Sequence, residues 1–170
     1  MTQKRMYDVL WIEDDARTDT TRYIPPVKQT FQYRLSIARD LSEAVHFLID
    51  EKKKYDAVIV DMRLPIGADK RLQKIAPHTP GYARIDHKHG IEMLYILLGS
   101  DRAKVKLPKP AWITVEHIGV FTIDRYLDIE EPLKLLSIPQ NHYRQKGTRV
   151  GATTLLDLIK FITEPQNGTP

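Results

Sequence analysis

Two short runs of the chain are apolar at every position, and acidic residues follow each run at once. Residues 9–12 read VLWI and precede the acidic segment 13–15, while residues 57–60 read AVIV and precede Asp61. A strand that alternates apolar and polar residues buries one face, whereas a strand that is apolar throughout buries both. Strands of the second kind belong to parallel sheets with helices on both sides. The two runs therefore predict two buried strands of such a sheet.

Helical patterns separate the expected strands. The apolar residues of segment 41–49 recur with the spacing of an amphipathic helix, and segment 16–31 is expected to form a helix that Pro25 and Pro26 kink or restart. Because each parallel crossover needs a helix to return the chain, this alternation predicts a doubly wound α/β fold with a five-stranded parallel sheet. The strands are expected at residues 9–12, 34–38, 57–60, 111–115 and 142–145, and the helices at residues 16–31, 41–49, 91–98 and 155–162.

The composition limits the chemistry that the chain can perform. Its 170 residues, 42% of them hydrophobic, fit one domain. The sequence has no apolar run of about 18 residues and no signal peptide, so a cytoplasmic protein without membrane contact is expected. The absence of cysteine excludes disulfides and thiolate metal sites, so any metal must bind oxygen or imidazole. A net charge of +4 is too mild an excess to indicate nucleic-acid binding.

The acids that follow the two apolar runs are expected to meet. Ligands of open parallel sheets bind at the carboxyl ends of the strands, and segment 13–15 and Asp61 both lie at such ends. Carboxylates held close together repel one another unless a cation joins them, and an all-oxygen cluster suits Mg²⁺. The alternative is that segment 13–15 only caps the next helix, but capping accounts for one acid rather than four.

The two acidic motifs resemble those of response-regulator receiver domains. Residues 9–15 (VLWIEDD) are similar to the first-strand acidic motif of that family, and residues 55–65 (YDAVIVDMRLP) to its phosphoacceptor strand and following turn. The gap between the motifs also has the family's order of helix, strand and helix. The chain is therefore identified as a CheY-like receiver domain, which implies a flavodoxin-like fold.

The resemblance also implies roles for the acidic residues. Asp61 would be the phosphorylated carboxylate, and Mg²⁺ would be the cofactor. Asp14 would bind the ion directly, Glu13 would bind it through water, and Arg63 would bind it through its backbone carbonyl. Asp15 resembles a residue that starts the following helix.

Segment 142–146 (HYRQK) is similar to the end of the fifth strand in the family. The resemblance implies that Lys146 contacts the phosphoryl oxygens and that Tyr143 is the aromatic switch residue. The sequence departs from the family at Gly147, where receivers usually carry a proline that is often in a cis bond, and this departure puts the loop geometry in question.

The family carries a hydroxyl residue on its fourth strand, and Thr114 matches it if segment 111–115 is that strand. Thr122, which lies nearer to Lys146 in the sequence, is the alternative. Between Thr114 and Lys146 the chain is longer than the resemblance implies, so the fourth helix is expected to be enlarged or irregular.

The expected domain spans residues 1–163, with residues 164–170 as a tail or the start of a linker. Segment 66–89 looks like an insertion, and its five basic side chains against two acidic ones make it positively charged. With Pro77, Pro80 and little apolar periodicity, it is expected to be exposed and mobile.

The resemblance implies a phosphoacceptor switch of a two-component phosphorelay rather than an enzyme, apart from self-directed phosphotransfer and autodephosphorylation. Its partner would be a sensor histidine kinase or a histidine phosphotransfer protein, and a homodimer is compatible with this role. The alternative is a pseudo-receiver that binds partners without phosphorylation. A dehalogenase-type hydrolase needs a second acid where Arg63 stands, and the basic loop lacks the interleaved aromatics of a nucleic-acid contact apart from Tyr82.

Overall fold

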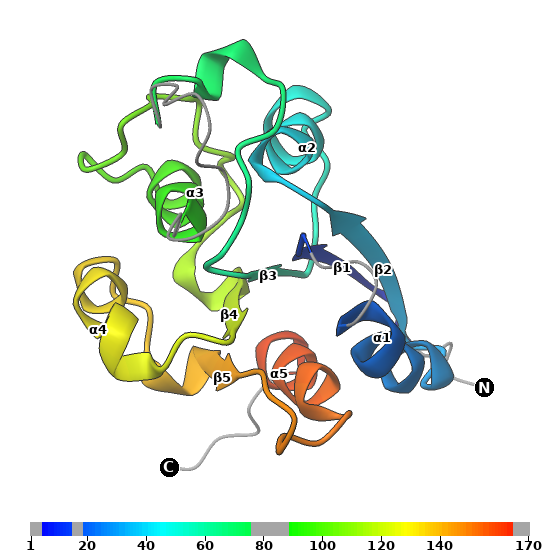
Figure 1. Ribbon diagram of the computed structural model, residues 1–170. Coiled ribbons are helices and arrows are strands. Elements are labelled where there is room, and N and C mark those ends of the chain that lie inside the picture. The colour runs from blue at the N-terminus through cyan, green and yellow to red at the C-terminus, as the bar shows by residue number, and fades with distance from the viewer. Residues whose placement is uncertain (1–4, 15–18, 76–88, 165–170) are drawn as a thin grey trace, which may run out of the picture.

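Five parallel strands form one sheet at the centre of the molecule (Figure 1). The computed structural model describes residues 5–14, 19–75 and 89–164. The strands lie side by side in the order β2-β1-β3-β4-β5. The predicted doubly wound five-stranded sheet is therefore confirmed. The bounds of the strands are β1 Tyr7–Ile12, β2 Tyr33–Ala38, β3 Ala57–Val60, β4 Ile118–Thr122 and β5 Tyr143–Gln145.

Helices cover both faces of the sheet (Figure 1). One face carries α1 (Asp19–Gln29) and α5 (Thr154–Thr163), and the other carries α2 (Leu41–Val45), α3 (His89–Leu98) and α4 (Tyr126–Leu135). Successive strand residues point to opposite faces, so the strands feed two separate cores. The first core contains Trp11, Tyr23, Ile59 and Phe121, and the second contains Leu10, Ile12, Val58 and Val60.

The register of β1 and β3 brings the two acidic motifs together. Ile12 pairs with Val60 at the carboxyl ends of the two strands. The next residues, Glu13 and Asp61, therefore leave the sheet side by side. The backbone N–H of Asp61 donates to the carbonyl of Ile12 at 3.0 Å, which fixes this arrangement.

The fourth strand differs from its predicted position. A strand over residues 111–115 is wrong: this segment forms turns, and β4 runs over Ile118–Thr122 instead. This strand contains Gly119, where a Cβ would lie 2.6 Å from Ile162 Cδ1 and 2.7 Å from Ile59 Cδ1. A larger residue there would require these side chains to shift. Because glycine is uncommon inside strands, segment 111–115 has a more strand-like sequence than the segment that forms β4.

Two helical predictions also need correction. The fourth helix, expected to be enlarged or irregular, is not enlarged: α4 has ten residues, with Pro132 inside it, and the long connection lies before β4, over residues 99–117. The predicted helix over 41–49 begins as α2 and continues as a wider π-helical turn over His46–Asp50. The first helix runs through Pro25 and Pro26 as one element rather than restarting there.

The first part of the predicted basic insertion packs on the core. Leu72 and Ile75 are buried, and Ile66 packs against the same cluster. The backbone N–H of Ser42 donates to the carbonyl of Ile66 at 3.0 Å, and the Ser42 hydroxyl donates to it at 2.7 Å. The expected exposure is therefore wrong at Ile66, Leu72 and Ile75, while residues 76–88 lie outside the described part of the chain.

The remaining predictions concern the ends of the domain and its environment. The predicted tail falls outside the described residues except for Glu164, whose side chain accepts a 3.1 Å hydrogen bond from the Tyr33 hydroxyl. Among the described residues, no helix has both the length and the apolar character that a membrane span requires.

Candidate functional site

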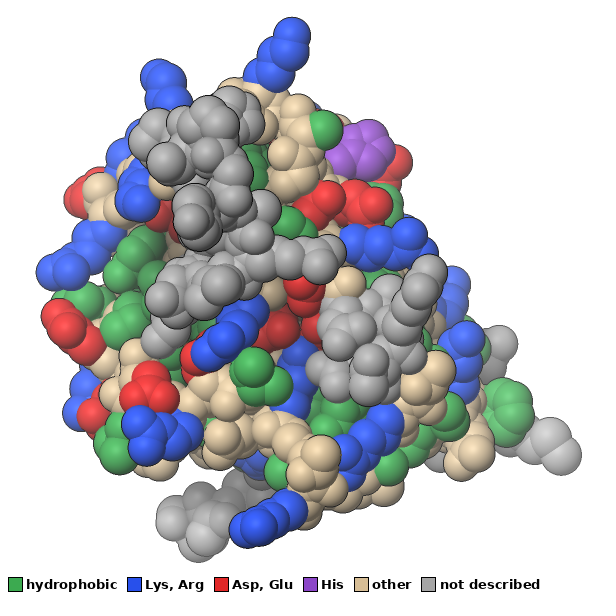
Figure 2. All heavy atoms as spheres, viewed as in Figure 1, with side chains coloured by type: hydrophobic (Ala, Val, Ile, Leu, Met, Phe, Trp, Pro, Cys, Tyr) green, Lys and Arg blue, Asp and Glu red, His purple; other side chains and the backbone are tan. Residues whose placement is uncertain are grey.

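Three carboxylates meet at the carboxyl ends of β1 and β3. Glu13, Asp14 and Asp61 each place an oxygen within 4.8 Å of the other two. Glu13 and Asp61 are buried, whereas Asp14 is exposed. In the space-filling view, acidic side chains gather near the middle of the face that is turned to the viewer, with basic side chains beside them (Figure 2). The structure thus brings together three of the four acids that the sequence singled out, and the fourth, Asp15, lies outside the described residues.

Lys146 neutralises part of this charge. It follows β5, and its backbone N–H donates to the carbonyl of Thr122 at 2.8 Å. Its buried ammonium donates to Asp61 Oδ2 at 2.9 Å and also to Glu13 Oε2. Burial alone would lower the pKa of Lys146, but Asp61 and Glu13 outweigh burial and raise it above its usual value. Lys146 is therefore a fixed positive charge inside the cluster.

Aromatic rings surround the Lys146 ammonium on its inner side. The Nζ atom lies 5.9 Å from the ring centroid of Trp11 and 5.6 Å from that of Phe121. These rings exclude water from one side of the charge, and their negative faces attract it. The ammonium is thereby directed to the carboxylates.

A further acid, Asp124, lies just beyond the end of β4. Its buried carboxylate accepts two hydrogen bonds from the Arg63 guanidinium, at 3.2 Å from Nε and 2.9 Å from Nη2. The Thr122 hydroxyl donates to the same carboxylate at 3.4 Å. Arg63 also donates its backbone N–H to Asp61 Oδ1 at 3.3 Å. The turn after β3 is thus connected to the end of β4 through side chains.

One of the two candidate threonines lies at the carboxyl end of β4, and the other precedes the strand. Thr122 is the last residue of the strand and is buried beside Asp124 and Lys146. Thr114 is four residues ahead of the strand, where it caps a short 3₁₀ turn and its hydroxyl lies 3.0 Å from His117 Nδ1. The structure therefore keeps Thr114 away from the carboxylates, because the strand begins later than the sequence predicts. Thr122 takes its place in the site.

Tyr143 connects the site to the outer surface. Its hydroxyl donates to the Asp124 carbonyl at 2.6 Å, and its ring packs 5.4 Å from the ring of Tyr126. Burial, followed by the nearby Asp124 charge, raises the pKa of Tyr143 to about 12.

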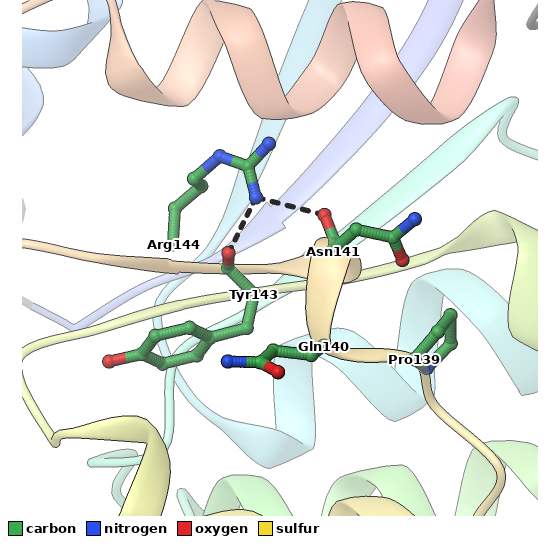
Figure 3. Close-up of a pocket in the computed structure, with 5 residues that line it drawn as sticks. All are labelled: Pro139, Gln140, Asn141, Tyr143 and Arg144. Carbon is green, nitrogen blue, oxygen red and sulfur yellow. Dashed lines mark hydrogen bonds between the residues drawn. The ribbon is translucent and has the colours of Figure 1, made fainter.

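Tyr143 and Arg144 point to opposite sides of β5 (Figure 3). An open hollow beside the strand is lined by Pro139, Gln140, Asn141, Tyr143 and Arg144.

The carboxylate cluster fits a divalent cation. The Lys146 ammonium contacts two of the three carboxylates, those of Asp61 and Glu13, and the exposed Asp14 lies beside them. Carboxylates held this close repel one another, and a cation that binds them together reduces that repulsion. Carboxylate oxygens without sulfur or imidazole suit a hard cation such as Mg²⁺. The exposed Asp14 gives the site an opening to solvent.

Solved structures share this architecture. The manganese-bound form of response regulator Rcp1 has a TM-score of 0.53 at 18% identity, over 92% of this chain and 89% of that one. The phosphorylated cyanobacterial phytochrome response regulator RcpA has a TM-score of 0.51 at 16% identity, over 93% and 89%. A CheY-like receiver domain protein from Methanospirillum hungatei JF-1 has a TM-score of 0.52 at 17% identity, over 91% of both chains. This chain has the receiver fold.

The receiver fold can be recognised from the structure, whereas similarity along the whole sequence does not reveal it. No protein-family model matches the sequence, and no curated protein matches it. At 16–18% identity the likeness to the solved receivers is a likeness of fold. The carboxylate and lysine side chains of this chain must therefore carry any conclusion about function.

Two residues of the site were not predicted from the sequence. Asp124 follows residues 118–123 (IGVFTI), a largely apolar run that Gly119 and Thr122 interrupt. The pattern that singled out Glu13 and Asp61 is therefore weaker here, and the sequence places the strand at residues 111–115 instead. Arg22, which contacts the loop after Lys146, has no local pattern that could have revealed it.

Proposed function

We propose that the protein is a receiver-type switch whose Asp61 accepts a phosphoryl group from a phosphohistidine. The donor would be a sensor histidine kinase or a histidine phosphotransfer protein in the cytoplasm. One observation carries the proposal: the Lys146 ammonium bonds to Asp61 and to Glu13, the two buried members of a cluster of three carboxylates. A simple ion pair needs one acid, whereas this lysine holds carboxylates from the ends of two strands, in an all-oxygen cluster whose chemistry suits a hard cation.

The Asp61 carboxylate is the nucleophile in this proposal. One oxygen of Asp61 attacks the phosphorus, the phosphorus–nitrogen bond of the donor breaks, and the released imidazole nitrogen takes up a proton. The product is an acyl phosphate, which water later hydrolyses to the carboxylate and phosphate. Asp61 suits this role because it ends a fully buried strand and its Oδ2 is already held by Lys146 at 2.9 Å. Phosphoryl transfer depends mainly on such positioning and on charge neutralisation.

Glu13, Asp14, Asp61 and the Arg63 backbone carbonyl would hold Mg²⁺. When bound, the ion supplies positive charge that offsets the carboxylates and the phosphoryl oxygens. The manganese in the related Rcp1 structure is consistent with a divalent ion in this fold. Lys146 would move its hydrogen bond from Asp61 to a phosphoryl oxygen, and the Thr122 hydroxyl would donate to another.

The output would pass through Asp124 and Tyr143. Thr122 donates to the Asp124 carboxylate, and Tyr143 donates to the Asp124 carbonyl. If Thr122 turns to the phosphoryl group, Asp124 loses one of its hydrogen bonds, and the position of Tyr143 changes with it. The exposed surface beside β5 would then favour a different partner.

Labelling with acetyl phosphate tests this proposal. We expect the wild-type protein with Mg²⁺ to gain the mass of one phosphoryl group in intact-mass measurements and to gain none with EDTA. Lys146→Ala should label more slowly, since the phosphoryl oxygens lose a fixed positive charge. A wild-type protein that takes label from neither acetyl phosphate nor any phosphohistidine donor would contradict the proposal and favour a pseudo-receiver that binds partners without phosphorylation.

A further inference from the structure

The loop that follows Lys146 has little local structure to hold it. Strand β5 has three residues and pairs only with β4, at the edge of the sheet. After Lys146 the chain turns through residues 147–153 before α5 begins, and the turn is closed by a 3.1 Å hydrogen bond from the Val150 N–H to the Gly147 carbonyl. Gly147 does not constrain this turn, because a Cβ there would meet only Val150, at 3.9 Å. The Lys146 N–H is bonded to the Thr122 carbonyl at 2.8 Å, but the loop beyond it depends on contacts from outside the loop.

Arg22 in α1 supplies this restraint. Its guanidinium donates to the Gly147 carbonyl at 2.9 Å, to the Thr148 carbonyl at 3.3 Å and to the Val150 carbonyl. The three acceptors span the turn, and they lie about 125 positions away in the sequence. A guanidinium presents several donors in a rigid plane, so it holds several carbonyls in one arrangement, which a lysine cannot do.

The same arginine supports the rings that surround the Lys146 ammonium. Its guanidinium lies 5.3 Å from the ring centroid of Tyr23, and the Tyr23 ring packs edge-on to Phe121 at 4.9 Å. Phe121 in turn lies 5.6 Å from the ammonium of Lys146. Arg22 thus contacts the structure around Lys146 at two places, the backbone loop that follows it and the aromatic layer beneath its charge.

We infer that Arg22 is a positioning residue that holds Lys146 in register with Asp61. It fixes the carbonyls of the loop after Lys146 and so keeps the ammonium on the carboxylates. The inference rests on the proposed function only where phosphorylation is the measurement, because the position of Lys146 can also be observed directly. Arg22 touches none of the three carboxylates through any described hydrogen bond, so it acts through Lys146.

The first measurement is direct and needs no phosphorylation. In wild-type protein, the buried Lys146 ammonium should give a slowly exchanging nitrogen–proton NMR signal, assigned by its absence in Lys146→Ala. Arg22→Gln should weaken or abolish this signal and speed hydrogen exchange at residues 147–150. Arg22→Lys should restore the charge but only part of the signal. Arg34→Gln is the matched control, because Arg34 forms a 2.7 Å surface bond with Asp8 and lies outside this network.

The second measurement is a double-mutant cycle on labelling with acetyl phosphate. We expect Arg22→Gln to slow labelling by roughly ten- to a hundredfold, the loss that follows when a reacting group is misplaced. Its Mg²⁺ affinity should stay at the wild-type value, because the proposed ligands are Glu13, Asp14 and Asp61. Arg22→Gln should add no further loss to Lys146→Ala, since both changes remove the same contact.

Three outcomes would overturn the inference. They are an unchanged Lys146 signal in Arg22→Gln, wild-type labelling by that variant, and losses that multiply in the double variant. If Arg22→Gln does not fold, full signal and full labelling in Arg22→Lys would also overturn it. If the wild-type protein takes no phosphoryl group, the proposed function fails, while the NMR comparison still decides whether Arg22 positions Lys146.

Discussion

At the residue scale, the pairing of Arg63 with Asp124 shows how burial changes the importance of an ion pair. The Asp124 side chain is 4% exposed, and it accepts two hydrogen bonds from a guanidinium that is half exposed. Arg63→Met would leave this buried carboxylate without its bidentate partner. We expect the free energy of unfolding to fall by about 1–3 kcal/mol, measured by urea denaturation.

Arg125→Met is the matched control for that prediction. Arg125 binds Asp128 with the same two donors, at 3.1 and 3.0 Å, but both side chains are exposed. Exposed pairs contribute little, so the loss should stay below about 1 kcal/mol. Equal losses in the two variants would contradict the view that burial of Asp124 decides the effect.

Two tyrosines should ionise late because they are partly buried. Burial is the largest cause for both Tyr33 and Tyr143, and it raises each pKa to about 12. Because the folded pKa values exceed the unfolded value near 10, each tyrosine stabilises the fold fully below about pH 10 and loses this effect as the pH rises towards 12. An absorbance titration of the phenolates should show a late phase, and Tyr143→Phe should reduce its amplitude. A late phase that is the same in wild type and Tyr143→Phe would contradict the assignment.

At the element scale, helix α3 starts directly against the turn that carries Asp61. The Gly90 N–H donates to the Met62 carbonyl at 3.0 Å, and a Cβ on Gly90 would lie 2.0 Å from the Asp61 carbonyl oxygen. Alanine in place of glycine usually stabilises a helix by up to about 1 kcal/mol. For Gly90→Ala we expect the opposite effect. The free energy of unfolding, measured by thermal or urea denaturation, should fall by at least about 2 kcal/mol, because the backbone at Asp61 or Gly90 must move to make room for the Cβ.

Gly151→Ala provides the comparison for Gly90→Ala. A Cβ on Gly151 would meet only Thr153 Oγ1, at 3.8 Å, which is an ordinary contact. Its effect on the free energy of unfolding should stay within about 0.5 kcal/mol. A Gly90→Ala protein that is as stable as wild type would show that α3 does not pack against the Asp61 turn.

The sequence predicts elements well where the pattern is local and poorly where packing decides. Strand β3 and residues 9–12 of β1 are apolar throughout, so their position and their acidic ends could be predicted. Strand β4 could not, because it contains Gly119, which packs against Ile59 in β3 and Ile162 in α5. Segment 111–115 has a similar apolar content without glycine. The tertiary structure, and not the local sequence, decides that this segment does not form a strand.

At the scale of the whole molecule, the site is a consequence of strand order. The order β2-β1-β3-β4-β5 places the ends of β1, β3 and β4 next to one another, so residues from distant segments meet at one edge. Glu13, Asp14 and Asp61 could be predicted because they follow the apolar runs of β1 and β3, and Lys146 because segment 142–146 resembles the end of the family's fifth strand. Arg22 could not, since its contact with Gly147 joins positions that are far apart in sequence and belong to no motif.

The shared pocket predicts that Mg²⁺ binding depends on acids from two strands. Asp14→Asn and Asp61→Asn should each lower the Mg²⁺ affinity by at least about tenfold, because each removes a charge that offsets ion dehydration. Asp157→Asn is the charge-matched control, since Asp157 lies on α5 and accepts a 3.2 Å bond from Thr153. In isothermal titration calorimetry, we expect the control to bind Mg²⁺ with the wild-type affinity. Unchanged affinity in both site variants would place the ion elsewhere.

The most direct test of the central claim is to locate the phosphoryl group on the chain. Asp61 is the clustered acid that follows the fully buried strand β3, and the Lys146 ammonium holds its Oδ2 at 2.9 Å, so the account predicts that Asp61 is the sole acceptor. After incubation with acetyl phosphate and Mg²⁺, borohydride reduction of the acyl phosphate and peptide mass spectrometry should find the modification at Asp61 and nowhere in Asp61→Asn. Label retained in Asp61→Asn, or a modification mapped to Asp14 in the wild type, would contradict the account.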